Sequence, residues 1–243
     1  MKYIGSIKDT YVGGEISAAA GVAGGCFLRL LKSFQATITL CELGLTNEAA
    51  NQARAALETA IILGFLEARP EEMVERLKEE NVANKMLYLK ALLYFEEVST
   101  EPNAEYMTHI KAQMEAIRSA YGGKAPRDIK IGDIATKWNV GLSLYKGPYR
   151  VLSAFGSHAT ITALNALFKD DADDGEPSFV FGIVDTGLSD VLAYSCGALI
   201  HGFGIYQDML QHKATDDRIE GLLAAWRKYF DSAMENSPLI HDW

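Results

Sequence analysis

Helical periodicity dominates this chain, and short helix-stop signals divide it into segments. The stretch 16–43 is rich in alanine, leucine and glycine and ends at Gly44, and T-N-E at 46–48 predicts a fresh helix N-terminus. R-P at 69–70 predicts the end of that second helix near residue 68, because proline is tolerated in the first turn of a helix but not in its interior. Long helical segments joined by short connections pack as bundles.

The remainder of the chain predicts further helices. An amphipathic pattern after Pro70 begins with acidic residues and places Met73, Val74 and Leu77 on one face, so one long helix is expected there. Pro148 is expected in the first turn of a later helix, and the acidic run 170–178 predicts a solvated loop followed by a short extended segment. The expected helices after the first two span 71–98, 103–121, 131–139, 148–168, 185–212 and 215–235.

Neither a repeat period nor a shift in composition divides the 243 residues. Hydrophobic residues make up 49% of the chain and charged residues 23%, which is typical of an ordinary globular protein. We therefore predict one all-α domain over residues 1–243, folded as a single bundle of about eight helices.

Charge and hydropathy argue against two classes of partner. The formal net charge of −9 argues against a large non-specific nucleic-acid surface, because such surfaces neutralise phosphates with lysine and arginine. Two apolar stretches are rejected as membrane spans: 16–31 is short and contains Arg29, and 188–206 contains Asp190 and His201. The N-terminal segment has no apolar signal region, so we expect a cytoplasmic protein that does not enter a membrane.

No metal or cofactor is predicted. The three cysteines, Cys26, Cys41 and Cys196, form no C-x-x-C pair and lie in apolar helical stretches, which favours reduced thiols. The five histidines form no H-E-x-x-H motif and no Glu-x-x-His pair. The glycine clusters do not lie between a strand and a helix, so they do not predict a nucleotide loop.

Two distant helical segments place polar groups in apolar surroundings. Arg54 and Glu58 are spaced i,i+4 in the first segment, and Tyr149 and Ser153 share a stripe in the second, with His158 beside it. Burial of a charge is costly unless a partner compensates it. These five residues are therefore predicted to form one polar cluster between two helices, which either locks the bundle or binds a small polar ligand.

The same residues carry a resemblance to a known family. The chain resembles a bacterial domain-of-unknown-function family, numbered five-six-seven-seven, whose members pair an R-x-x-x-E helix with a later Y-x-x-L-S-x-x-x-H helix. Arg54, Glu58, Tyr149 and Ser153 match this pattern, and His158 comes one residue late. The resemblance covers roughly residues 25–170 and implies an all-helical fold with a polar cluster, but no established activity.

A looser similarity links the chain to helical nucleotide-binding-associated domains, many of which are metal-independent RNases. That similarity implies that His158 would transfer a proton at the ribose 2′-hydroxyl while Arg150 would stabilise the charged phosphate. Seven residues separate Arg150 from His158, more than the four to six of the family motif. An RNase-like enzyme with these two catalytic candidates is the first alternative function.

A second alternative is a DNA-associated regulator. The stretch 131–146 imitates the rhythm of a helix-turn-helix, and 124–150 contains six lysine or arginine residues against two aspartates. The leading hypothesis remains a helical binding or interaction protein with the polar cluster as its site. A homodimer and a small polar ligand or RNA are the partners that the sequence leaves open.

Overall fold

The structure, a computed structural model, describes residues 17–156, 168–170, 177–179, 187–210 and 216–235. The helices of this part of the chain are α2 (Ala18–Glu42), α3 (Thr46–Ala68), α4 (Pro70–Glu97), α5 (Ala104–Ala120), α6 (Ile131–Ala135), α7 (Asn139–Leu144), the π-helix η1 (Tyr145–Tyr149), α8 (Arg150–Gly156), α10 (Leu188–Met209) and α11 (Asp216–Glu235). Strands β1 (Phe168–Asp170) and β2 (Pro177–Phe179) form a short antiparallel pair in which Phe168 lies opposite Phe179. The predicted all-α fold class is confirmed.

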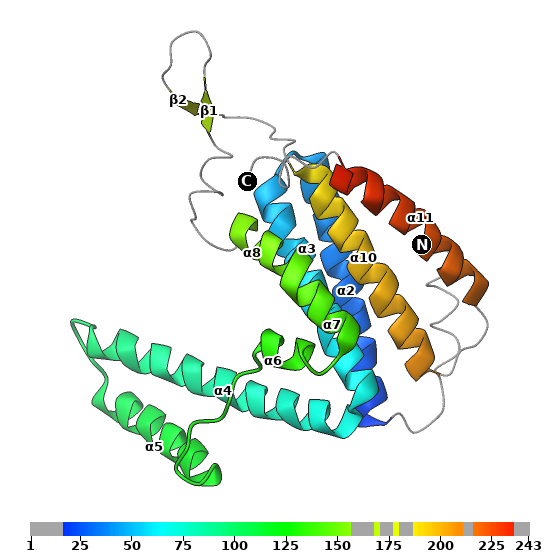
Figure 1. Cartoon of the computed structure of the whole chain (residues 1–243). Helices are drawn as coiled ribbons and strands as arrows, with labels where there is room; N and C mark the ends of the chain where they lie inside the picture. The colour runs from blue at the N-terminus through cyan, green and yellow to red at the C-terminus, as the bar shows by residue number, and fades with distance from the viewer. Residues whose placement is uncertain (1–16, 157–167, 171–176, 180–186, 211–215, 236–243) are drawn as a thin grey trace.

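Helices α2, α3 and α10 form the centre of the bundle, and α11 covers the outer side of α10 (Figure 1). Most residues in the middle of α3 are buried, with Leu57 and Ile61 at 0% exposure, because this helix is covered on several sides. Helices α2 and α10 approach closely where Leu30 packs on Gly202, since any larger side chain at Gly202 would collide with it. Trp226 joins α11 to α10 by donating from Nε1 to the carbonyl oxygen of Ala193 at 2.8 Å.

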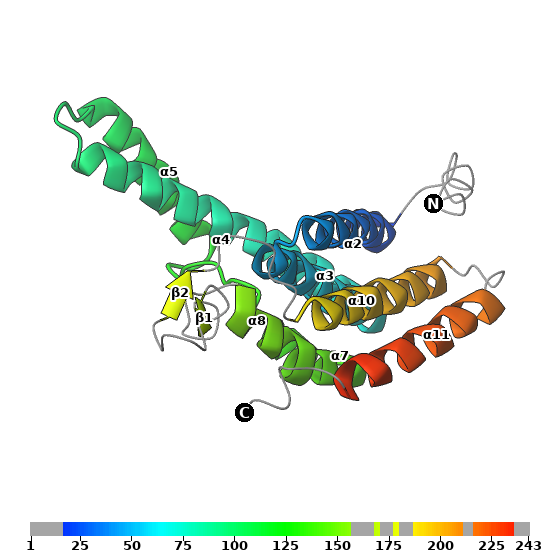
Figure 2. The same ribbon diagram turned by 90° about the horizontal axis from the view of Figure 1, so that it is seen from above.

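Helices α4 and α5 form a hairpin that projects away from the bundle, here called the arm (Figures 1 and 2). Met86 and Leu89 of α4 pack with Ile110 and Met114 of α5 in a small apolar cluster separate from the main core. Asn103 begins α5 by accepting a hydrogen bond from the backbone N–H of Tyr106 at 3.0 Å. The arm therefore holds itself together through its own contacts.

The T-N-E signal at 46–48 places the start of the second helix correctly, since α3 begins at Thr46, although Leu45 occupies the N-cap position and forms no side-chain cap hydrogen bond. The helix start predicted at Pro148 is wrong. Pro148 was expected in the first turn of a helix, yet it lies inside η1, between α7 and α8. The wider π-turn accommodates the missing N–H and the proline ring, so the chain stays helical from Asn139 to Gly156.

Helix α10 is long and apolar enough to cross a membrane by length and composition alone. Half of its most apolar window is buried inside the protein, however, and the core helix of a soluble protein meets the same criterion. Asp190, near its start, is fully buried among the packed helices.

Candidate functional site

Three side chains predicted to cluster meet between α3 and η1, and we call them the polar triad: Arg54, Glu58 and Tyr149. Arg54 Nη2 donates to the Tyr149 hydroxyl at 3.0 Å, and that hydroxyl donates to Glu58 Oε1 at 3.0 Å. Arg54 also forms a direct ion pair with Glu58 at 3.1 Å. The i,i+4 spacing on α3 brings the two charges together, and the tyrosine reaches them from a segment about ninety residues later.

The surroundings of the triad are aromatic and only partly open. The Tyr149 ring stacks on Tyr145 with centroids 5.1 Å apart, and the Arg54 guanidinium carbon lies 5.1 Å from the Tyr149 centroid. Burial raises the pKa of Tyr149, and its hydrogen bond from Arg54 opposes that rise. The phenol is therefore protonated at neutral pH and able to donate to Glu58.

The other predicted cluster residues have different positions. Ser153 of α8 donates its hydroxyl hydrogen to the backbone carbonyl oxygen of Tyr149, four residues earlier, at 2.7 Å. His158 lies outside the described residues. Arg150 is exposed at the start of α8.

The helix-turn-helix hypothesis required an exposed surface at residues 142–145. Leu144 is 8% exposed and belongs to the main core, and Tyr145 is half-buried against Tyr149. Helices α6 and α7 are also only five and six residues long. This burial argues against a recognition helix at 131–146.

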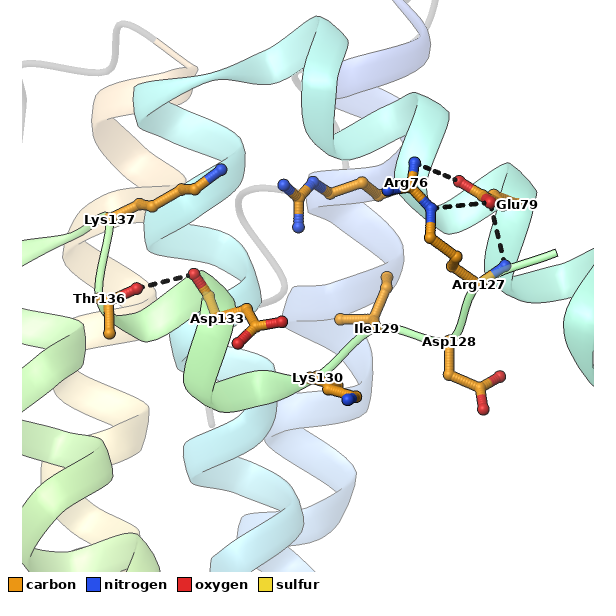
Figure 3. A pocket seen from close by; sticks show the side chains of 9 residues that line it. All are labelled: Arg76, Glu79, Arg127, Asp128, Ile129, Lys130, Asp133, Thr136 and Lys137. Atoms are coloured by element: carbon orange, nitrogen blue, oxygen red, sulfur yellow. Dashed lines mark hydrogen bonds and ion pairs between the residues drawn. The ribbon is translucent and has the colours of Figure 1, made fainter.

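A second polar site lies where α4 leaves the bundle, beside the segment that leads into α6 (Figure 3). This charged cleft has a volume of about 400 Å³, within the range of small-molecule sites. Its lining includes four cationic and three acidic side chains. The lining residues are Arg76, Glu79, Arg127, Asp128, Ile129, Lys130, Asp133, Thr136 and Lys137.

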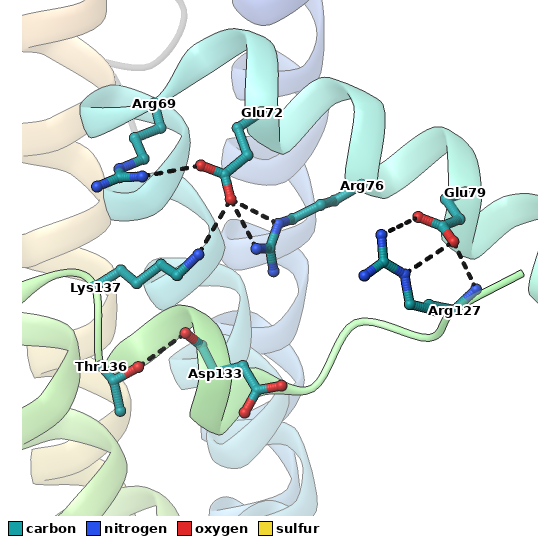
Figure 4. A network of polar contacts seen from close by, with 8 residues as sticks. All are labelled: Arg69, Glu72, Arg76, Glu79, Arg127, Asp133, Thr136 and Lys137. Atoms are coloured by element: carbon teal, nitrogen blue, oxygen red, sulfur yellow. Dashed lines mark hydrogen bonds and ion pairs between the residues drawn. The ribbon is translucent and has the colours of Figure 1, made fainter.

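Glu72 binds three cations at one end of the cleft (Figure 4). Its Oε1 accepts from Arg76 Nη2 at 2.7 Å and from Lys137 Nζ at 3.2 Å, and its Oε2 accepts from Arg69 at 3.1 Å. The hydrogen bonds from Arg69, Arg76 and Lys137 lower the pKa of Glu72 to about 2. Glu72 therefore stays ionised at neutral pH and holds Lys137 against α4.

Glu79 of α4 binds the segment that connects α5 to α6, at Arg127. Its carboxylate accepts from the backbone N–H of Arg127 at 2.9 Å and from the guanidinium at 3.2 Å (Figure 4). These hydrogen bonds lower the pKa of Glu79. The two glutamates of α4 thus fix the cleft wall at residues 127 and 137.

The fully buried Phe65 of α3 supports the cations of the cleft. Arg76 and Lys137 lie over its ring, at 5.4 Å and 5.8 Å from the centroid. Cation–π attraction and the shared carboxylate therefore fix the positions of both side chains.

The sequence pointed to the cleft only through its basic stretch. Arg127, Lys130 and Lys137 belong to the excess of lysine and arginine noted in 124–150, and the structure places all three in the lining. The acidic partners on α4 were missed, because their i,i+3 and i,i+4 spacings resemble those of any solvated helix face. Within the described ranges, no group of three or more histidine, cysteine or acidic residues could hold a metal ion.

Comparison with known proteins identifies a family for this chain. A family model described as "Family of unknown function (DUF5677)" matches residues 20–176, which include the triad and the cleft. No curated protein and no solved structure matches the chain. The matched range ends before α10, although α10 packs at the centre of the bundle.

Proposed function

This chain belongs to the family of unknown function DUF5677, and because that membership brings no activity with it, we propose a function from the site alone. The protein is a helical binding module that takes a small anionic ligand, carrying one carboxylate or phosphate group, into the charged cleft. The polar triad serves in this proposal as the lock that holds η1 on α3.

The observation that carries the proposal is the convergence of Arg76 and Lys137 on one carboxylate oxygen. These cations are 61 positions apart in the sequence and lie 2.7 and 3.2 Å from Glu72 Oε1. Arginine has five N–H donors and lysine three, so both keep donors beyond those used on Glu72. Figure 3 shows the Arg76 guanidinium reaching into the cleft, where an incoming anion would meet it.

The charge balance of the lining favours a small ligand over a polyanion. Asp128 and Asp133 lie on the wall opposite α4, and Glu79 lies on α4 itself (Figure 3). These carboxylates oppose a chain of phosphates, whereas a single anionic group can bind near the cations without approaching them. The cleft therefore supports a compact anion better than RNA.

The triad supports a structural role because the Tyr149 hydroxyl links its two charged members. The Tyr149 hydroxyl accepts a hydrogen bond from Arg54 and donates one to Glu58. Both of these hydrogen bonds lie inside the triad. The Tyr149 ring also stacks on Tyr145. A ligand at the triad would have to displace those bonds.

Ligand-observed NMR tests the proposal with acetate, AMP and inorganic phosphate as probes at constant ionic strength. We expect at least one probe to bind wild type, and Lys137→Gln to weaken that binding about tenfold or more, as expected for loss of a charged hydrogen bond. Lys78→Gln is the matched control, because Lys78 also pairs with a glutamate of α4 but lies outside the cleft lining. Absence of binding by every probe, or equal weakening in both variants, overturns the proposal.

The RNase alternative requires its own control. Wild type and His158→Ala are incubated with a mixed RNA pool without metal. Cleavage that is lost in His158→Ala would replace the binding proposal with the enzymatic one.

A further inference from the structure

The outer half of α4 carries a second apolar face that no described residue covers. Its members, here called the arm stripe, lie on the side of α4 away from α5. They are Leu87, Tyr88, Ala91, Tyr94 and Phe95 of α4, and Val98 at its C-cap. Positions 87, 91, 94 and 98 follow the 4-3-4 spacing of a helix–helix seam, and 88 and 95 flank it seven residues apart.

The stripe is too large and too apolar for an ordinary solvated face. Tyr88, Tyr94 and Phe95 are 64%, 62% and 67% exposed, and Leu87 and Val98 are 52% and 59% exposed. With 150–250 Å² for each aromatic side chain, the exposed stripe amounts to about 600 Å². That area is at the upper limit for patches on monomers and approaches the roughly 800 Å² per partner of a stable complex.

The order of side chains along the stripe matches a second, antiparallel copy. If the two α4 helices cross between residues 92 and 93, each Tyr94 faces the small Ala91 of the second copy, and each Leu87 faces Val98. Large residues then meet small ones, as in a well-packed helix seam. A parallel pairing would instead set Tyr94 against Tyr94 and leave a gap at Ala91.

Charges at the edge of the stripe favour the same pairing. Lys90 and Glu97 lie seven residues apart on one flank of the seam, both exposed. In the antiparallel arrangement each Lys90 faces Glu97 of the second copy, which gives two ion pairs across the interface. On the other flank Tyr88 faces Phe95 of the second copy, which gives two aromatic pairs.

The shape of the molecule allows α4 helices of two copies to pack against each other in antiparallel orientation. The bundle joins α4 at its Pro70 end, and the arm extends away from it (Figure 2). Antiparallel α4 helices therefore place the two bundles at opposite ends of the pair. A helix of 28 residues is about 42 Å long, so the bundles do not collide.

We propose that the arm stripe is the interface of an antiparallel homodimer, formed by α4 of two copies of this chain. The interface is isologous, because the same residues contribute from both sides of a two-fold axis. It is independent of the ligand proposed for the charged cleft.

Native mass spectrometry and analytical ultracentrifugation test the dimer with the full chain. Wild type is expected at twice the monomer mass of 26.6 kDa, and Tyr94→Glu is expected as monomer. Tyr106→Glu is the control, because Tyr106 is an exposed tyrosine of the arm that lies on α5, outside the stripe. A monomeric wild type at 100 µM, or a dimer that Tyr94→Glu leaves intact, overturns the proposal.

A charge exchange tests the orientation and does not depend on a disruptive substitution. Lys90→Glu alone and Glu97→Lys alone each create like-charge contacts and are expected to raise the dimer Kd about tenfold. An equimolar mixture of the two variants restores both ion pairs and is expected to form heterodimers with wild-type affinity. A mixture that dimerises no better than the separate variants overturns the antiparallel arrangement.

Discussion

The indole of Trp138 packs directly on Gly64 of α3. A Cβ atom added to Gly64 would lie 2.5 Å from Cε2 of Trp138, and one added to Gly141 would lie 2.5 Å from Cε3 of the same ring. Two glycines thus hold the ring that joins the α6–α7 segment to the bundle. This contact positions the wall of the charged cleft, because Lys137 precedes Trp138.

We predict that Gly64→Ala lowers the free energy of unfolding by about 1–3 kcal/mol, the usual cost of overpacking a core site. Urea unfolding followed by circular dichroism measures the change. Gly25→Ala in α2 is the control, because a Cβ there meets nothing within 4 Å. Alanine inside a helix should raise the stability of that variant by up to about 1 kcal/mol. Equal effects of the two substitutions would show that Trp138 does not constrain position 64.

Tyr149→Phe tests the polar triad. The substitution removes the hydroxyl between Arg54 and Glu58 but keeps the aromatic ring, so we expect a loss of about 1–2 kcal/mol in the free energy of unfolding. Tyr145→Phe serves for comparison, since the Tyr145 hydroxyl forms no hydrogen bond within the described part of the chain. Its stability should stay within about 0.5 kcal/mol of wild type. A Tyr149→Phe protein as stable as wild type would mean that the triad does not lock η1 on α3.

The lowered pKa of Glu72 predicts that the free energy of unfolding depends on pH. Its pKa is lowered from 4.5 to about 2 in the folded protein. The unfolded chain therefore binds the proton more readily, and the stabilisation by the carboxylate, complete above about pH 5, is lost as the pH falls towards 2.

Urea midpoints measured at several pH values between 6 and 2 test this dependence, with pH 6 as the reference. Wild type should lose more stability on acidification than Glu72→Gln, in which the titrating group is absent. Glu75→Gln should follow the wild-type curve, because the ion pair of Glu75 within the described ranges is with the exposed Lys78. Parallel curves for wild type and Glu72→Gln would contradict the prediction.

The three cysteines are free thiols whose pKa values are raised by burial. We expect iodoacetamide at neutral pH to modify all three more slowly in the native protein than in urea, with the buried Cys41 slowest. Mass spectrometry of the peptides measures each rate. Rapid native labelling of Cys41 would show that α2 opens at its C-terminal end.

The helices were largely predictable because their signals are local. Periodicity placed α2, α3, α4 and α5 close to their observed bounds, and Met73 and Val74 are buried as the pattern indicated. The prediction that Pro148 begins a helix was wrong, because a proline can lie inside a π-turn and such a turn has no sequence signature. Trp138 divides the expected helix 131–139, because its ring reaches Gly64 of another helix.

The sites were predictable only in part. Arg54, Glu58 and Tyr149 could be paired because two spaced motifs pointed to one cluster, and the structure brings these three side chains together. The charged cleft depends on contacts of Glu72 with Lys137 and of Glu79 with Arg127, and no periodic pattern reports such distant pairs. The arm stripe escaped notice because α4 is apolar on two faces, and a single amphipathic pattern describes only one of them.

The packing of Leu30 on Gly202 also determines when the core can close during synthesis. These residues are 172 positions apart in the sequence. At 5–20 residues per second, the ribosome needs roughly ten to thirty seconds to add that length. The α2–α3 hairpin can form early from local contacts, but its apolar surface stays open on the nascent chain until α10 emerges. Translation of α10 therefore sets the period during which this protein is vulnerable to aggregation.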